Sequence, residues 1–113
     1  SMDIATLFGN ALDNAIEASR RVPDPAKRLI ELALFRRGEM VVIRVDNWFD
    51  GRLSTDAGGR LTTIKADGVR HGWGVKSIQW TARKYGGQAA TRAEDHWFTL
   101  TVLLPSASPL QER

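Results

Sequence analysis

Three polar residues near the start of the chain have the spacing that places them on one face of a helix. Asn10, Asn14 and Glu17 recur at intervals of four and three, so a helix that advances by about 100° per residue aligns them in one narrow stripe. Amide and carboxylate oxygens suit Mg²⁺, which usually keeps waters and phosphates as its other ligands. The stripe indicates a candidate magnesium site, although polar residues on a solvated helix face have the same spacing.

Two glycines mark a second candidate site. The segment His-Gly-Trp-Gly at residues 71–74 leads into a helix that we expect from Val75 onward. Glycines let backbone N–H groups approach an anion closely, and a helix N-terminus favours negative charge. Lys76 and Ser77 stand in the first turn of this predicted helix, within reach of phosphate oxygens. The pattern indicates either a phosphate-binding loop or a tight loop without a ligand, and it lacks both a P-loop motif and a complete dinucleotide fingerprint.

A third candidate site lies at the end of a predicted strand, where Asp46 and Asn47 precede Gly51. A carboxylate there can accept a hydrogen bond from the exocyclic amine of a nucleobase. A nearby glycine lets a flat ring approach the backbone. A strand that simply ends in a turn has the same residues, so this feature alone leaves nucleotide binding open.

Two helices and two hairpins are needed to position these residues. Apolar residues at helical spacing predict the first helix, which Asp3 can cap and which the prolines after Val22 end. Apolar segments on either side of short turns predict the paired strands, and the pair Gly86-Gly87 ends the second helix. The predicted elements are helices over residues 3–19 and 75–85 and strands over residues 29–35, 40–46, 88–94 and 97–104.

This order of elements predicts an α+β fold, a two-layer sandwich with both helices on one face of a mixed, largely antiparallel sheet. Residues 48–70 contain four glycines and little apolar periodicity, so we expect an irregular segment there, either a functional lid or binding loop or a disordered stretch. One domain is expected over residues 3–105. Residues 1–2 are interpreted as a remnant of cloning, and residues 106–113 as a frayed tail.

The composition is that of a soluble globular domain. Of the 113 residues, 42% are hydrophobic and 26% are charged, both ordinary values. The formal net charge of +3 is a small excess from scattered basic residues, so we expect no nucleic-acid partner. The sequence has no cysteine, which excludes a disulfide framework and a cysteine-based zinc site. It also lacks the run of about 18 apolar residues that a membrane span needs.

In chain order, the three candidate sites resemble the motifs of the GHKL (Bergerat-fold) ATPases. Residues 7–18 (LFGNALDNAIEA) resemble the N box, residues 45–51 (VDNWFDG) a divergent G1 box, and residues 72–78 (GWGVKSI) the G2 box. Residues 98–105 resemble the closing strand, so the resemblance extends over residues 3–105. The motifs are most similar to those of the AgrC-type quorum-sensing histidine kinases. The resemblance implies the Bergerat fold, with ATP and Mg²⁺ as ligands.

The resemblance also implies a role for each matching residue. Asn14 is the expected Mg²⁺ ligand, and Asn10 stands where ATPase relatives place a glutamate base. Because an amide cannot act as a base, phosphoryl transfer to histidine is favoured over hydrolysis. Asp46 is expected to contact the adenine amine, and residues 52–71 to form a short lid. The expected nucleotide-binding residues are Asn14, Glu17, Asp46, Asn47, Gly51, Lys65, Gly72, Gly74, Val75, Lys76, Ser77 and Thr99, with Thr101 as an alternative to Thr99 and Arg70 as a further lid cation.

By this resemblance, the chain is the catalytic domain of a two-component sensor histidine kinase. Its expected partners are a separate dimerisation domain that carries the acceptor histidine, and a response regulator. Neither His71 nor His96 resembles that acceptor, and the strand that usually precedes the N-box helix is absent. We therefore expect a fragment that lacks its first strand. The full-length protein is expected to be a homodimer in a bacterial cell membrane, with this domain in the cytoplasm.

Two alternatives remain open at this point. Trp48 stands where the G1 box usually has a glycine, and Trp73 where the G2 box usually has a smaller aliphatic residue. Both departures are compatible with a degenerate GHKL domain that serves as a protein interaction module. A serine-directed anti-sigma kinase or a GHKL ATPase is the other alternative.

Overall fold

The computed structural model describes the backbone of residues 2–50, 53–55, 61–63 and 68–106, and the side chains of residues 4–50 and 74–106. Both predicted helices and all four predicted strands are present, so the α+β class is confirmed. The elements are α1 (Met2–Arg20), the 3-10 helix η1 (Pro25–Lys27), β1 (Ile30–Arg37), β2 (Met40–Trp48), β3 (Leu53–Thr55), β4 (Leu61–Thr63), α2 (Gly68–Lys84), β5 (Gln88–Glu94) and β6 (Trp97–Pro105).

Two hairpins form the main sheet, in the strand order β1-β2-β6-β5. All three strand pairs are antiparallel. The described sheet is therefore wholly antiparallel, whereas the prediction was of a mixed, largely antiparallel sheet. Gly38 turns the first hairpin with a φ of +60°. Asp95 and His96 turn the second with φ values of 52° and 70°, the two left-handed residues of a type I′ turn. The central contact of the sheet is therefore β2 against β6, which joins the two hairpins.

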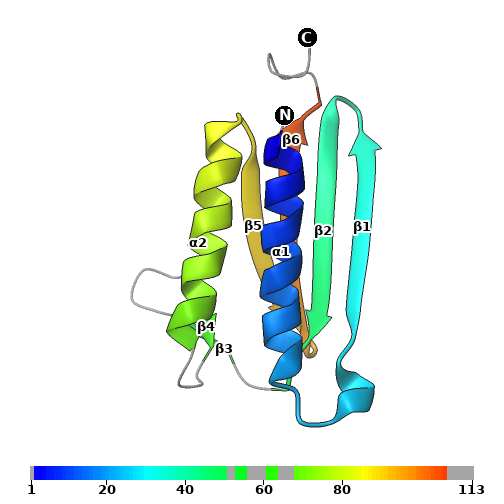
Figure 1. Cartoon of the computed structure of the whole chain (residues 1–113), viewed down its shortest axis with the longest axis vertical. Coiled ribbons are helices and arrows are strands. Elements are labelled where there is room, and N and C mark those ends of the chain that lie inside the picture. The colour runs from blue at the N-terminus through cyan, green and yellow to red at the C-terminus, as the bar shows by residue number, and fades with distance from the viewer. Residues whose placement is uncertain (1, 51–52, 56–60, 64–67, 107–113) are drawn as a thin grey trace.

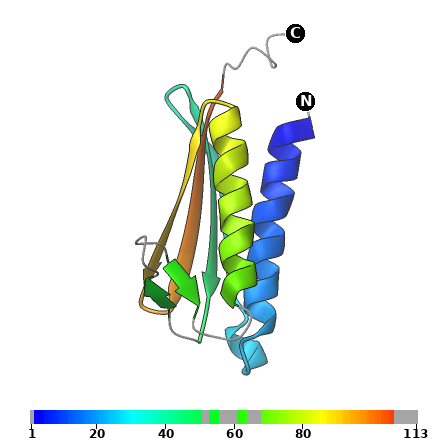
Figure 2. The ribbon, with the colours of Figure 1, turned by 90° about the vertical axis from the view of Figure 1, so that its left-hand side faces the viewer.

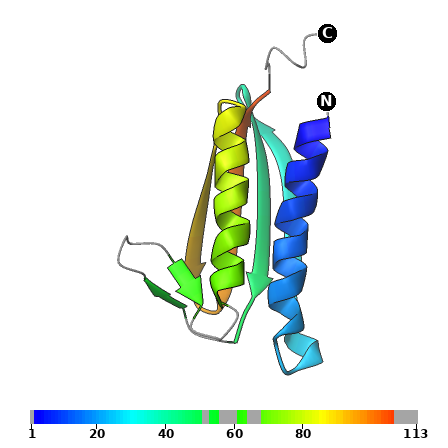
Figure 3. The ribbon, with the colours of Figure 1, turned by 60° about the vertical axis from the view of Figure 1, so that its left-hand side comes forward.

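Both helices cover the same face of this sheet (Figures 1, 2 and 3). Helix α1 contacts β2 and β1, helix α2 contacts β5 and β6, and the helices contact each other. The core fills the layer between helices and sheet, and its buried side chains are Leu7, Ala11, Ala15, Ile43, Val45, Ile78, Ala82, Leu100, Val102 and Leu104. No described element covers the opposite face.

Helix α1 agrees with its prediction to within a residue at each end. Leu7, Ala11 and Ala15 are each 1% exposed, and their spacing of four places them on one side of the helix. The helix begins at Met2, so this residue of the predicted cloning remnant belongs to the first helix. None of the helices in the described part of the chain has the length and hydropathy that a membrane crossing requires.

Helix α2 ends one residue before its predicted end and begins seven residues earlier than predicted. Its end is fixed by Gly86, which has a φ of +82°, and by Gly87, where an added Cβ would lie 1.9 Å from the carbonyl oxygen of Leu103. Its start at Gly68 lies seven positions before the predicted Val75. Part of the predicted irregular loop is thus helical, which contradicts the prediction. The two glycines at 72 and 74 lower helix propensity, and this local signal concealed the first turns of the helix.

A second sheet lies in the same predicted loop. Strands β3 and β4 pair antiparallel, with Ser54 opposite Thr62, and β4 contacts α2 (Figure 3). Three-residue strands contain too few positions for an alternating pattern to be read from sequence. The expectation of a wholly irregular segment was therefore wrong for residues 53–55 and 61–63.

Candidate functional site

The N-box asparagine Asn14 lies at the contact between the two helices. A Cβ added to Gly74 of α2 would lie 3.1 Å from Oδ1 of Asn14, tighter than ordinary van der Waals contact. The side chain of Asn14 is half-buried. No hydrogen bond joins it to any other part of the described chain. The structure therefore brings together one residue from each of two predicted motifs, and places beside the glycine an amide oxygen that no described residue engages.

The other two members of the predicted stripe differ from Asn14. Asn10 is exposed and Glu17 is half-buried. The Glu17 carboxylate lies 3.6 Å from the guanidinium of Arg21, which also donates a hydrogen bond to the Glu17 carbonyl oxygen at 3.1 Å. Of the three, only Asn14 has atoms within 4 Å of a Cβ added to Gly74.

The glycines of the G2 box lie inside α2 and not in a loop ahead of it. Because α2 begins at Gly68, the backbone N–H groups of Val75, Lys76 and Ser77 lie beyond the first four residues. Groups at such positions donate to carbonyls within the helix. The predicted phosphate site at a helix N-terminus is therefore absent from this described conformation. The side chain of Val75 is half-buried, while those of Lys76 and Ser77 are exposed.

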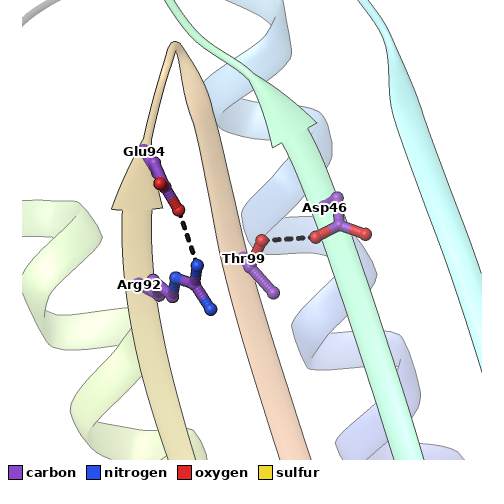
Figure 4. A network of polar contacts seen from close by, with 4 residues as sticks. All are labelled: Asp46, Arg92, Glu94 and Thr99. Carbon is purple, nitrogen blue, oxygen red and sulfur yellow. Dashed lines mark hydrogen bonds and ion pairs between the residues drawn. The ribbon is translucent and has the colours of Figure 1, made fainter.

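Asp46 and Thr99 lie on the face of the sheet that the helices leave open (Figure 4). Thr99 Oγ1 donates a hydrogen bond to Asp46 Oδ1, and Arg44 Nε lies 3.3 Å from Asp46 Oδ2. Both carboxylate oxygens are thus engaged within the open face. Residues of β2, β5 and β6 line a shallow groove here, in which Arg92 pairs with its neighbour Glu94 at 2.6 Å.

The strand alternation places Asp46 and Thr99 on the face opposite Asn14, and their expected roles in nucleotide binding stay predictions. Successive residues of a strand point to opposite faces of its sheet, and Asp46 alternates with the core residue Val45. Asp46 is therefore separated from Asn14 by the sheet itself. A carboxylate so placed cannot contact a base bound on the helix side. Thr101, the alternative to Thr99, lines the same open groove.

Asn47 is the polar residue of this strand that faces the helices. It follows Ile43 and Val45 at intervals of two and is 2% exposed. Its Nδ2 donates a long hydrogen bond of 3.4 Å to the Trp48 carbonyl oxygen, and Oδ1 has no partner among the described residues. An unsatisfied buried polar group costs about 1–3 kcal/mol. The alternation from Ile43 predicts this inward orientation, and the match to the motif's letters concealed it.

Trp48, which occupies the expected glycine position, has a packing role. Its ring stacks on that of His96 with centroids 5.0 Å apart, and Lys27 Nζ lies 5.2 Å from its centroid. The next residue, Phe49, donates its N–H to the His96 carbonyl oxygen at 2.8 Å. The two contacts with His96 hold the end of β2 against the turn between β5 and β6, and the Lys27 contact holds it against η1. Gly51 and Lys65 lie outside the described residues, as does the side chain of Arg70.

The residues present fit a magnesium ion that is held mainly by a nucleotide. The described side chains form no group of three or more His, Cys, Asp or Glu residues that suits a metal. Mg²⁺ is commonly bound through one or two protein oxygens, with phosphates and waters completing its octahedron. Oδ1 of Asn14 can supply one such oxygen, and the missing side chain of Gly74 keeps the space beside it clear.

Comparison with known families agrees with the motifs. A family model described as a GHKL domain matches residues 1–105, which include all of the elements above. The chain therefore belongs to the GHKL domain family and is an ATP-binding domain of that family. A search of curated proteins found no match. The resemblance seen in the sequence is thus confirmed at the level of the family and of ATP binding.

Proposed function

We propose that the chain is the catalytic domain of a two-component sensor histidine kinase. The domain binds ATP with Mg²⁺ and presents the γ-phosphate to a histidine on a separate dimerisation domain, from which a response regulator receives it. The observation that best supports this proposal is the contact of Asn14 with Gly74, where an amide oxygen without a partner among the described residues meets a position without a side chain. In the full-length protein we place the domain on the cytoplasmic side of a bacterial membrane, as part of a homodimer.

Phosphoryl transfer is accelerated mainly by alignment of the reacting groups and by charge stabilisation. The protein therefore has to position the nucleotide rather than form a covalent bond to it. Bound Mg²⁺ supplies positive charge to the phosphates. Oδ1 of Asn14 would supply one oxygen to that ion. Asn10, one turn earlier and exposed, carries an amide that cannot take a proton from water. The site therefore lacks a base at this position, and the nucleophile comes from another domain.

Phosphate contacts near Gly74 require α2 to shorten. The N–H groups of residues 75–77 are used inside the helix that begins at Gly68. Gly72 and Gly74 each lower helix stability by about 1 kcal/mol relative to alanine, so the turns before Val75 are the easiest part of α2 to unwind. We propose that nucleotide binds with α2 beginning near Val75, which exposes these N–H groups together with Lys76 and Ser77.

Two measurements test the proposal. Calorimetric titration of the chain with ATP and ADP, with and without Mg²⁺, is expected to show binding that depends on the metal. Incubation with ATP and the dimerisation domain is expected to give a phosphate that is labile in acid and stable in base, as phosphohistidine is. An acid-stable product indicates the serine-directed alternative. Release of phosphate without a protein product indicates an ATPase.

A second function is favoured by one observation. Helix α2 runs unbroken through Gly72 and Gly74, so the described conformation presents no free N–H groups there. A degenerate GHKL domain that acts as a protein interaction module would have this property permanently. Nucleotide affinity that is unchanged by Asn14→Ala would favour this second function.

A further inference from the structure

Strand β1 and the residue before it carry most of the exposed apolar surface in the described part of the chain. Five large hydrophobic residues are exposed there. Four of the five, each 38–62% exposed, are Leu29, Leu32, Leu34 and Phe35. The strand is the outermost one in the order β1-β2-β6-β5, at the edge of the domain away from α2 (Figure 1). A long apolar edge strand is a template on which another strand can pair.

The backbone of β1 has hydrogen-bonding groups that point away from β2. Trp48 donates its N–H to the Leu29 carbonyl oxygen at 3.0 Å, so the hydrogen-bonded pairs with β2 fall at the odd-numbered positions. The N–H and C=O groups at the even positions therefore point to the outer edge. These positions are Ile30, Leu32, Leu34 and Arg36. Among the described residues, no strand pairs with this edge.

We propose that two copies of this chain join through β1, antiparallel about a two-fold axis at Leu34, so that their four-stranded sheets become one continuous sheet. Such an interface uses the same surface of both copies. Residues directly opposite on antiparallel strands share a face of the sheet. In this arrangement the exposed Glu31 of each copy lies opposite the exposed Arg37 of the other copy. Opposite charges therefore meet twice, once on each side of the axis.

The charges select this register over its neighbours. A slip that keeps each face of the strand on its own side of the sheet must move the pairing by two residues. In one direction such a slip places Glu31 opposite Phe35, and in the other it places Glu31 opposite Glu39. Of these three registers, only the one centred on Leu34 sets Glu31 opposite a positive charge.

The same register gathers the exposed leucines on the helix side of the sheet. Leu32 and Leu34 face that side, because they pair with the core residues Val45 and Ile43 of β2. Leu34, at 62% the most exposed of the large hydrophobics, lies opposite its own copy. Leu32 of each copy is a diagonal neighbour of that pair, about 7–8 Å away. Four leucines thus shield one another from water, and the contact between α1 and α2 takes no part.

The first test is the mass of the 113-residue chain in solution. Sedimentation equilibrium is expected to show the mass rising with concentration from 12.6 kDa towards twice that value. An interface of one strand from each copy is small, so a dissociation constant of about 10–100 μM is expected. A chain that stays monomeric up to about 1 mM would overturn the inference. Because the test contains no nucleotide, its outcome is independent of the proposed function.

Two charge variants test the register. Glu31→Arg and Arg37→Glu are each expected to weaken self-association by about 10-fold, because like charges then face each other twice. An equimolar mixture of the two variants restores opposite charges across the axis and should associate within about threefold of the parent chain. Within one copy the two residues are about 20 Å apart along the strand, so recovery cannot come from a pair inside one chain. A mixture no stronger than either variant alone would overturn the inference.

A backbone variant tests the pairing of the edge itself. Leu34→Pro removes an outward N–H, and proline is tolerated on an edge strand where that group faces solvent. The variant is expected to abolish association, with a melting temperature within about 5 °C of the parent value. Trp80→Ala is the matched control, because it removes an exposed large hydrophobic residue from α2 and should leave association unchanged. Folded Leu34→Pro that associates like the parent chain would overturn the inference. If proline unfolds the strand, the charge variants decide the question.

Discussion

The two faces of the main sheet are built from the same strands but treat polar groups differently. On the open face, Asp46 is paired with Arg44 and with Thr99. On the helix side, the residues of β2 are apolar until Asn47, whose amide oxygen has no partner among the described residues. Paired polar groups stabilise the open face, whereas the Asn47 amide oxygen is buried without a partner among the described residues, which costs stability. The two faces therefore differ in whether their polar side chains have hydrogen-bond or ion-pair partners.

The largest difference between the faces is expected in stability. Leu100 on the helix side is 2% exposed, so Leu100→Ala removes buried apolar volume and should lower the free energy of unfolding by about 2–5 kcal/mol. Thr101→Ala, at the next position and on the open face, should change it by less than about 1 kcal/mol. Urea denaturation of both variants measures these changes. Similar losses would mean that a further partner covers the open face in solution.

The next largest effect concerns the ligand. Asn14→Ala removes the amide oxygen beside Gly74 and is expected to weaken Mg²⁺-dependent ATP binding by about 100-fold, since a metal contact within the site is lost. Its melting temperature should stay close to that of the parent chain, because the side chain is half-buried and makes no hydrogen bond within the described chain. Calorimetry with and without the metal separates this effect from a general loss of affinity.

A smaller effect is expected from Asp46→Ala on the open face. The substitution removes the partner of Thr99 and of Arg44, so the free energy of unfolding should fall by about 1 kcal/mol. ATP affinity should stay within about twofold of the parent value. A tenfold loss of affinity, measured on folded protein, would show that the ligand reaches the open face and would remove the distinction between the faces.

The smallest effect compares two helical glycines. Alanine at Gly9 meets no atom within 4 Å, so Gly9→Ala should raise the free energy of unfolding by about 0.5–1 kcal/mol through helix propensity alone. Gly74→Ala should give less stabilisation, because its Cβ would press on the Asn14 amide at 3.1 Å, and it should also weaken ATP binding. Thermal denaturation with and without nucleotide measures both. An equal increase in the free energy of unfolding for both variants would mean that the Asn14 side chain moves away from the new Cβ at no cost.

Where local pattern and tertiary packing agree, the sequence predicts the fold closely. Strand β5 has the predicted bounds of residues 88–94, and α1 differs by one residue at each end. Prediction failed at residues 68–74, because two glycines suggest a loop where the helix continues. It also missed β3 and β4, whose three-residue lengths leave no period to detect.

For the candidate site, the sequence predicts where single residues lie on their elements but not which elements meet. Helical spacing places Asn14 correctly on the polar side of α1, but its contact with Gly74 depends on how α1 packs against α2 and has no local signal. The motif match by itself does not say which face of the sheet Asp46 lies on. The two-residue period of the strand, counted from the core position Val45, places Asn47 inward and Asp46 outward. A periodicity argument can therefore refine a motif match without any structure.

The pairing of β2 with β6 also has a consequence for how the domain folds. Each hairpin closes across a two-residue turn, and such hairpins form in about 1–10 μs. Joining them pairs Trp48 with Trp97, so residues 49–96 must be closed into one loop before the sheet is complete. Docking of the two hairpins is then the expected slow step, since nonlocal pairing carries the entropic cost of loop closure.

The entropic cost of closing this loop grows only with the logarithm of loop length, by about 0.6 kcal/mol for each doubling. The segment between β2 and α2 can thus lengthen or shorten greatly during evolution with little change in the stability of the sheet.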